Sequence, residues 1–243
     1  MTRCCRPRDH GLLRRVAFAA ALIAWSGGAF AAEPVRQIGI YVQPYYAAAR
    51  HPGEPPQVAV GASFNGPLSS SRREDIVAVR DRIMAEPKLV TPMTMMVLAI
   101  RLYDVGLRDD AVFWFYVAKD RFITLSEVVQ IGPSGLHQVE DAVRNFATLA
   151  GPVINGTAFC DLAKQQTLRR TALDWVERNP YQAIFMPQMA AKPGGRDANL
   201  KAAIQGIRDS VAKERGYFDN PKNREDFYAT RKKNEADVKF CWP

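Results

Sequence analysis

Few residues in this chain have the types and spacing needed for catalysis. The segment IGPSGL (131–136) places Ser134 three positions before His137. A serine nucleophile needs a base within hydrogen-bond reach and a third group that orients the base. A turn followed by a helix cap is the commoner explanation of such a segment, and we adopt it. The motifs of zinc proteases, serine hydrolases, phosphate loops and dinucleotide sites are absent from the sequence.

Histidines and carboxylates give no stronger indication of chemistry. Beyond the first 31 residues the histidines are His51 and His137, and metal ligands normally come in clusters. Two carboxylates could serve as acid and base for hydrolysis, although helix caps and solvated faces explain each candidate equally well. The candidates are Asp104, Asp109, Asp110, Glu140 and Asp141. We therefore predict no catalytic residue, no metal ligand and no cofactor.

The net charge of the chain is less basic than it first looks. The formal charge is +8, but the first 31 residues contain five arginines and one aspartate. Without them, 28 basic residues face 24 acidic ones, a net charge of +4. This value argues against an electrostatic nucleic-acid binder. Hydrophobic residues at 47% and charged residues at 24% are ordinary for a globular protein.

Residues 1–31 have the pattern of a cleaved secretory signal. Basic residues up to Arg15 are followed by an apolar run that ends in Ala29-Phe30-Ala31, which fits the small-x-small cleavage pattern. An uncleaved anchor is the alternative, but the run contains two glycines and is shorter than the roughly 20 residues that span a bilayer. We expect a mature chain from Ala32 with no transmembrane span, in the periplasm or secreted.

The cysteines agree with export to an oxidising compartment. Cys4 and Cys5 fall in the predicted signal, which leaves Cys160 and Cys241. An even number of cysteines in such a compartment predicts one disulfide. Two separate buried thiols are the alternative. The bridge would attach the last residues of the chain to the domain.

The mature chain is predicted to begin with a β-like arm and to continue as helices. Alternating residues in 36–46 suggest a strand, and 57–64 suggests a second one. From Ser69 the spacing of apolar residues is helical, and Thr91 followed by Pro92 is a strong helix start. Further helices are expected before Gly151 and over 157–179, 198–216 and 220–240, with a loop at 151–156.

The densest apolar stretch after the signal region is VFWFYV, residues 112–117. Asp109 and Asp110 precede it and suit a helix N-terminus, while Lys119 and Arg121 suit a C-terminus. We interpret the stretch as a helix, with a strand as the alternative. A helix that is apolar on all sides has to be buried on all sides.

Residues 95–124 resemble a single tetratricopeptide or Sel1-like helical hairpin. The resemblance is carried by Leu98, Ala99, Leu102, Gly106, Ala111, Phe115 and Ala118. In that unit small residues allow two antiparallel helices to approach, and a large residue fills the gap. The resemblance implies that Ala99, Ala111 and Ala118 are the contact points and that Phe115 is the plug. The family's closing proline is replaced by Ile123. An ordinary hairpin in a helical bundle is the alternative.

Two surface features suggest contact with a partner. Tyr45 and Tyr46 lie beside a proline-rich loop and are candidate exposed binding residues. Arg231, Lys232 and Lys233 form a basic cluster, which we interpret as a solvated helix face because Glu235 and Asp237 follow it.

Together these observations predict a mainly α protein, a helical bundle or short α-solenoid with a small β-like N-terminal arm. The expected parts are a signal (1–31), the arm (32–68) and a helical domain (69–243). We expect a non-enzymatic module that binds another envelope or periplasmic protein, as an adaptor, an assembly factor or an immunity-type protein. A hydrolase of envelope polymers with paired carboxylates is one alternative, and a structural envelope component is another.

Overall fold

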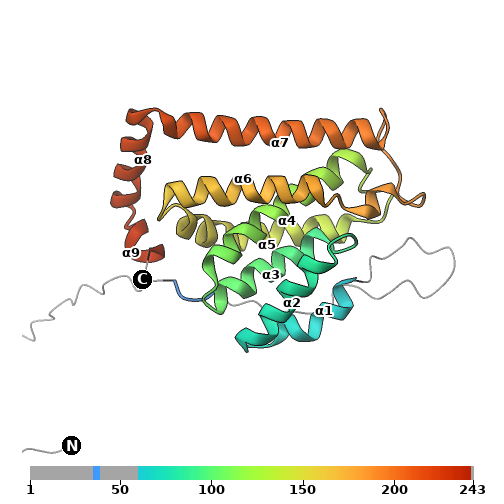
Figure 1. Ribbon diagram of the computed structural model, residues 1–243, viewed down its shortest axis with the longest axis horizontal. Coiled ribbons are helices and arrows are strands. Elements are labelled where there is room, and N and C mark those ends of the chain that lie inside the picture. The colour runs from blue at the N-terminus through green and yellow to red at the C-terminus, as the bar shows by residue number, and fades with distance from the viewer. Residues whose placement is uncertain (1–34, 39–59, 242–243) are drawn as a thin grey trace, which may run out of the picture. The chain divides into compact units, whose positions relative to one another are not determined.

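The computed structural model describes residues 35–38 and 60–241, which fall within one compact unit, Ala32–Pro243. The regular elements of this described part are helices, packed as a bundle, which confirms the prediction of a mainly α fold (Figure 1). None of the described helices has the length and apolar character that a bilayer span requires. The helices are α1 (Val60–Ser69), α2 (Arg73–Ala85), α3 (Pro92–Asp104), α4 (Arg108–Val128), α5 (His137–Ala158), α6 (Leu162–Arg178), the 3-10 helix η1 (Gln182–Phe185), α7 (Arg196–Asp219), α8 (Pro221–Lys233) and α9 (Ala236–Phe240).

Helices α3 and α4 form a hairpin at the centre of the bundle. The hydroxyl of Thr91 accepts a hydrogen bond from the backbone N–H of Thr94 at 3.0 Å, and Pro92 takes the first helical position, as predicted. The hairpin turns at Gly106, whose φ of 83° favours glycine. The turn is only three residues long, so the two helices run antiparallel.

The stretch 111–118 lies inside α4, which confirms the helix prediction. Helix α4 packs against α3, α5, α6 and α7, so it has neighbours on several sides. The side chain of Phe115 is 1% exposed and lies close to Gly151 of α5, while Trp114 packs edge-on against Trp175 of α6. Of the predicted hairpin residues, Leu98, Ala99, Leu102, Ala111, Phe115 and Ala118 are buried and Gly106 lies in the turn.

The prediction of a strand over 57–64 is wrong for the described residues, because α1 begins at Val60. Phe64 and Leu68 are four positions apart and therefore share one face of a helix; each is 3% exposed and part of the core. Helical structure thus starts before Ser69. Residues 35–38 have no regular secondary structure, and the rest of the predicted arm lies outside the described residues.

Two boundaries in the second half also differ from the prediction. Helix α5 continues through the expected loop 151–156, because Ile154 and Ala158 extend its buried face and this packing outweighs Pro152 inside the helix. The expected helix 157–179 is interrupted at 159–161, and Asp161 begins α6 by accepting a hydrogen bond from the Lys164 N–H at 2.9 Å. The expected helix 220–240 is divided at Glu235, whose φ is 53°.

Arg121 is a fully buried cation at the centre of the bundle. Its Nη1 donates to the backbone carbonyls of Pro87 and Val90, and its Nη2 donates to the carbonyl of Asn179. Burial lowers the pKa of Arg121 to about 10. These three carbonyls lie between α2 and α3 and at the end of α6, so one side chain of α4 holds both chain segments in place.

We expect Ala111→Leu to destabilise the fold by about 1–3 kcal/mol, because Ala111 has no exposed surface and a larger side chain would overpack the α3–α4 interface. Thermal unfolding measures the effect. Ala229→Leu, on the exposed surface of α8, is the matched control and should leave the melting temperature nearly unchanged. An unchanged melting temperature for Ala111→Leu would contradict this description of the hairpin.

Candidate functional site

Ser134 has a structural contact in the fold. Its side chain is 3% exposed, and its hydroxyl accepts a hydrogen bond from the backbone N–H of Ala190 at 3.0 Å. This bond joins the turn before α5 to the segment that also forms an isolated bridge between Val129 and Ala191. The imidazole of His137 lies against Gly132. The hydroxyl of Ser134 therefore has a structural role in this turn, in agreement with the interpretation of the segment as a turn.

The candidate carboxylates contact different cations. Asp104 pairs with Arg101 at 2.9 Å, Asp109 with Lys164 at 3.1 Å, Asp110 with Arg80 at 2.6 Å and Glu140 with Arg144 at 2.8 Å, while Asp141 is exposed. The described residues contain no group of three or more potential metal ligands. Tyr45, Tyr46 and His51 lie outside the described residues.

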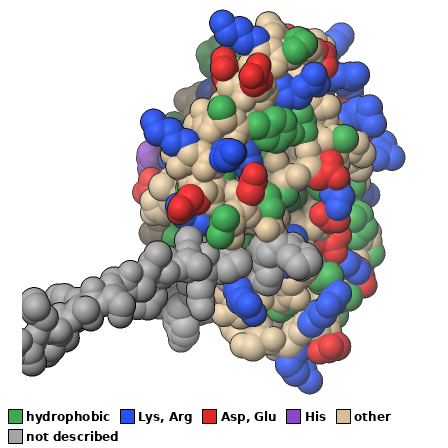
Figure 2. All heavy atoms as spheres, turned by 90° about the vertical axis from the view of Figure 1, so that its left-hand side faces the viewer, with side chains coloured by type: hydrophobic (Ala, Val, Ile, Leu, Met, Phe, Trp, Pro, Cys, Tyr) green, Lys and Arg blue, Asp and Glu red, His purple; other side chains and the backbone are tan. Residues whose placement is uncertain are grey.

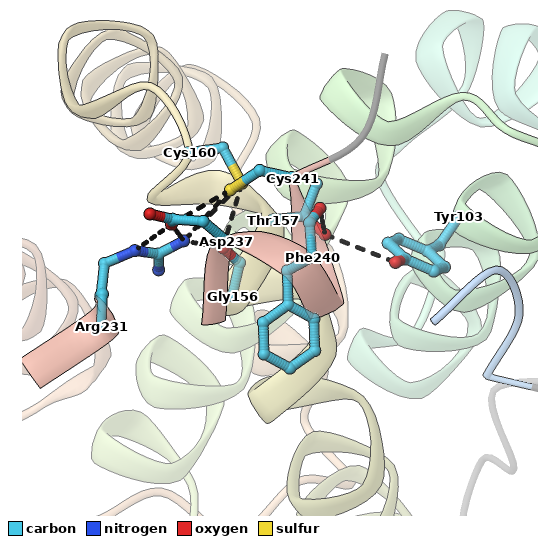
Figure 3. The surroundings of a disulfide bond; sticks show 8 residues. All are labelled: Tyr103, Gly156, Thr157, Cys160, Arg231, Asp237, Phe240 and Cys241. Carbon is cyan, nitrogen blue, oxygen red and sulfur yellow. Dashed lines mark hydrogen bonds and ion pairs between the residues drawn. A yellow bond between two sulfur atoms is a disulfide. The ribbon is translucent and has the colours of Figure 1, made fainter. Parts of the chain in front are cut away.

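The predicted disulfide is present, and it closes one end of the bundle (Figure 3). Cys160 lies in the turn between α5 and α6, and Cys241 directly follows α9, with 5.4 Å between their Cα atoms. The ring of Phe240 lies against Gly156, where a Cβ atom would come within 2.5 Å of the ring. The bridge and this close contact together fix α9 to the end of α5.

Arg231 organises the surroundings of the disulfide. Its side chain is 7% exposed, so the expectation that it belongs to a solvated basic face is wrong. Its guanidinium donates to Asp237 at 2.8 Å and to the backbone carbonyl of Gly156 at 3.2 Å (Figure 3). The turn at Glu235 folds α9 back toward α8, which brings Asp237 within reach of Arg231.

Replacing both cysteines by serine should lower the free energy of unfolding by about 4 kcal/mol, because the bridge closes a loop of 81 residues in the unfolded chain. Urea unfolding of the oxidised protein and of the double variant measures this difference. Intact-mass analysis without reductant provides the check on the bridge itself: two free thiols in protein from an oxidising compartment would contradict it.

A groove of about 500 Å3 lies between α6 and α7. The two helices run in opposite directions, since Arg208 near the middle of α7 pairs with Glu177 late in α6, and Glu214 later in α7 contacts Gln165 early in α6. The apolar lining consists of Ala163, Leu173, Val211 and Ala212, and the charged lining of Arg169, Arg170, Asp174, Arg208, Glu214 and Arg215.

The arginines of the groove differ in their contacts. Arg169 pairs with Asp120 and Arg208 pairs with Glu177. Arg170 and Arg215 are exposed and make no ion pair with any residue of the described part of the chain. They project from facing helices beside the apolar lining. The groove therefore offers an apolar surface flanked by two guanidiniums that are free to bind a carboxylate.

A buried polar network connects the two helices of the groove to α4. Arg169 holds Asp120 of α4 through two hydrogen bonds of 2.5 and 2.9 Å, and burial raises the pKa of Asp120 although Arg169 opposes this shift. The amide of Gln165 donates to the hydroxyl of Tyr116 at 3.1 Å and to Glu214 at 2.8 Å. Burial raises the pKa of Tyr116 to about 12. The network thus joins α4, α6 and α7.

The end of the molecule where α7 turns into α8 and α9 has a mixed surface. Figure 2 shows hydrophobic side chains lying among basic and acidic ones on this face, without a large area of one charge. Tyr217, Tyr228 and Val238 are the large exposed apolar residues of these three helices. Phe159, Phe218 and Phe227 form an aromatic cluster that packs this end. The pairing of basic with acidic residues here gives no clear preference for a charged ligand.

We expect Asp120→Ala to lower the free energy of unfolding by about 3–5 kcal/mol, because it leaves the nearly buried Arg169 without its counter-ion. The double variant Asp120→Leu with Arg169→Met removes both charges and should be clearly more stable than the single variant. Urea unfolding of both variants measures the coupling. Equal losses in the single and double variants would show that the ion pair is not the cause.

The residues of this network were not identified from the sequence. Asp120 gave no signal, because Lys119 and Arg121 beside it predict the C-terminal end of the helix. That prediction is wrong, since α4 continues to Val128 and Asp120 and Arg121 are buried. Arg169 and Gln165 gave none either, because they are polar residues of an amphipathic helix and only the tertiary structure shows that they face α4 and α7. Arg231 gave none either, since the sequence alone places it in a basic cluster.

The chain is 31% identical over 231 residues to a protein of Haemophilus influenzae described as an uncharacterized protein. The match covers 95% of this chain and 89% of that protein, so the two belong to one family. No family model matches the chain, and no solved structure matches it at a significant level.

Proposed function

We propose that this protein is an exported, periplasmic protein-binding module that acts as an adaptor, an assembly factor or an immunity-type protein. The observation that carries the proposal is the groove between α6 and α7, with its apolar lining and two exposed arginines that form no ion pair within residues 35–38 and 60–241. Grooves between helices accept a peptide segment or a helix through apolar anchors, and guanidiniums at the edge select carboxylates. The proposed partner therefore presents apolar side chains together with acidic ones.

Two features support export. The first 31 residues have the composition of a cleaved signal, and the disulfide Cys160–Cys241 is a bond typical of oxidising compartments. A periplasmic location of the mature chain accounts for both features. It also places the groove where envelope proteins would meet it.

The resemblance of α3 and α4 to one tetratricopeptide-like unit fits this proposal as a scaffold. Such repeats usually bind partners on an exposed concave surface. Here α4 is covered by α5, α6 and α7, and residues such as Leu98 and Phe115 are buried. The hairpin would then support the groove, and the partner would contact α6 and α7.

The alternative of a hydrolase with paired carboxylates has less support. Asp104, Asp109, Asp110 and Glu140 each pair with a different cation, which favours structural roles for them. A structural envelope component would be expected to self-associate, which size-exclusion chromatography of the mature protein detects.

The test is affinity capture of the tagged mature protein from its native periplasm at low salt, with quantitative mass spectrometry. We expect a partner in comparable molar amount to the bait. Thr167→Trp fills the groove and should reduce capture about tenfold, which corresponds to a loss of about 1.4 kcal/mol of binding free energy.

Thr171→Trp is the matched control for this experiment. Thr171 lies one turn further along α6, is exposed, makes the same kind of hydroxyl contact to a backbone carbonyl and does not line the groove. Its capture should equal that of the wild type. Capture that is equally strong in Thr167→Trp, or a bait without a stoichiometric partner, would contradict the proposed function.

A further inference from the structure

The disulfide Cys160–Cys241 is open to attack from outside. It lines a cavity of about 490 Å3 formed by the α3–α4 turn, the ends of α5 and α6, and α9. Cys160 is exposed, whereas Cys241 is half-buried. An external thiolate can therefore approach the sulfur of Cys160 more readily than that of Cys241.

A buried cation lies beside both sulfur atoms. The Nη2 atom of Arg231 is 3.2 Å from Sγ of Cys241 and 3.7 Å from Sγ of Cys160 (Figure 3). Because the Arg231 side chain is 7% exposed and bonded to Gly156 and Asp237, it is held in this position. A guanidinium next to a sulfur favours the thiolate over the thiol, which lowers the pKa of the cysteine.

The helix ends beside Cys160 oppose each other. Cys160 directly precedes Asp161, the N-cap of the 17-residue helix α6, and directly follows Phe159, the C-cap of the 22-residue helix α5, so a positive and a negative helix end meet there. Two acids oppose the effect of Arg231. Asp161 caps the Lys164 N–H, and an oxygen of Asp237 lies 3.5 Å from Sγ of Cys241. Asp237 is 61% exposed, so water screens its charge more than the charge of buried Arg231. The cation should therefore dominate.

We propose that Cys160–Cys241 is a thiol–disulfide exchange site for a dithiol oxidoreductase, with Arg231 stabilising the thiolate of Cys241 as the leaving group. This proposal rests on the disulfide environment and does not depend on the proposed partner groove.

The exchange balances in two steps. A thiolate of the external dithiol attacks Sγ of Cys160, a mixed disulfide forms, and the electron pair of the broken bond goes to Cys241 as a thiolate beside Arg231. The second thiolate of the dithiol then attacks the first sulfur of the same dithiol, which is bonded to Cys160 in the mixed disulfide. This attack releases Cys160 as a thiolate. The dithiol loses two electrons and becomes a disulfide. The protein disulfide gains these two electrons and becomes two thiols once protons bind.

The experiment uses dithiothreitol as the dithiol probe on the oxidised mature protein. The rate of reduction is followed by alkylation and mass analysis, and the thiol pKa of the reduced protein by the ultraviolet absorbance of the thiolate. In the wild type, at least one thiol should titrate below the ordinary cysteine value of about 8.5. Arg231→Met should raise this pKa and slow the reduction by about threefold or more, because the leaving group becomes more basic.

Asp237→Asn is the decisive second variant, because it removes the opposing charge at an exposed position. It should lower the thiol pKa further and speed the reduction. Arg224→Met removes an exposed cation of the same helix that makes no contact with the sulfurs and should change neither quantity. Arg231→Lys keeps the charge and should retain part of the effect.

A purely structural disulfide predicts a different pattern. Breaking the Arg231–Asp237 pair from either side would loosen α9, so both variants would then be reduced faster. That result, or thiols in the wild type that titrate at or above the ordinary value, would overturn the proposal. Changes of opposite sign in the thiol pKa and in the rate of reduction, comparing Arg231→Met with Asp237→Asn, would support the proposal.

Discussion

The central turns of helix α4 have to be buried on most sides, and most of the fold follows from this constraint. Trp114, Phe115 and Tyr116 follow one another there and are all buried, whereas Lys119, Ile123 and Glu127 keep one strip of the helix exposed. The chain therefore surrounds α4 with α3, α5, α6 and α7. The short turn at Gly106 supplies the first neighbour, and Gly151 of α5 leaves space for the ring of Phe115.

The burial of α4 creates an electrostatic requirement as well. Asp120 and Arg121 are adjacent, both are at most 1% exposed, and they point to different partners. The two terminal nitrogens of Arg121 donate to three backbone carbonyls, and Asp120 accepts from Arg169 of α6. A buried charge without such partners would be strongly destabilising. The same contacts fix the position of α6, and Gln165 and Glu214 then connect it to α7, so the shape of the α6–α7 groove depends on this polar network.

At the end of the bundle that carries the disulfide, several chain segments are joined by hydrogen bonds and by the covalent bridge. The N–H of Val35 donates to the carbonyl of Lys239, and the hydroxyl of Tyr103 donates to the carbonyl of Val35, so the start of the described chain, the α3–α4 hairpin and α9 meet there. The polar contacts here join segments that are far apart in the sequence, and Arg231 connects α8 to Asp237 and to the end of α5. The covalent bond adds stability beside the aromatic cluster of Phe159, Phe218 and Phe227. The groove on α6 and α7 and the disulfide bridge are therefore separate features of one scaffold.

The sequence by itself determined the helical class, the burial of the stretch 112–117 except for the half-buried Phe113, the helix start at Thr91 and the pairing of Cys160 with Cys241. These features depend on local periodicity, on local capping and on having two cysteines after the predicted signal. Tertiary contacts decided the rest. They made 60–64 helical because Phe64 and Leu68 meet the core, and they extended α5 past Pro152 because Ile154 and Ala158 are buried. They also brought Arg169 to Asp120 and Arg231 to the disulfide. Ion pairs between distant elements have no local periodicity, so only the folded arrangement of the helices could define them.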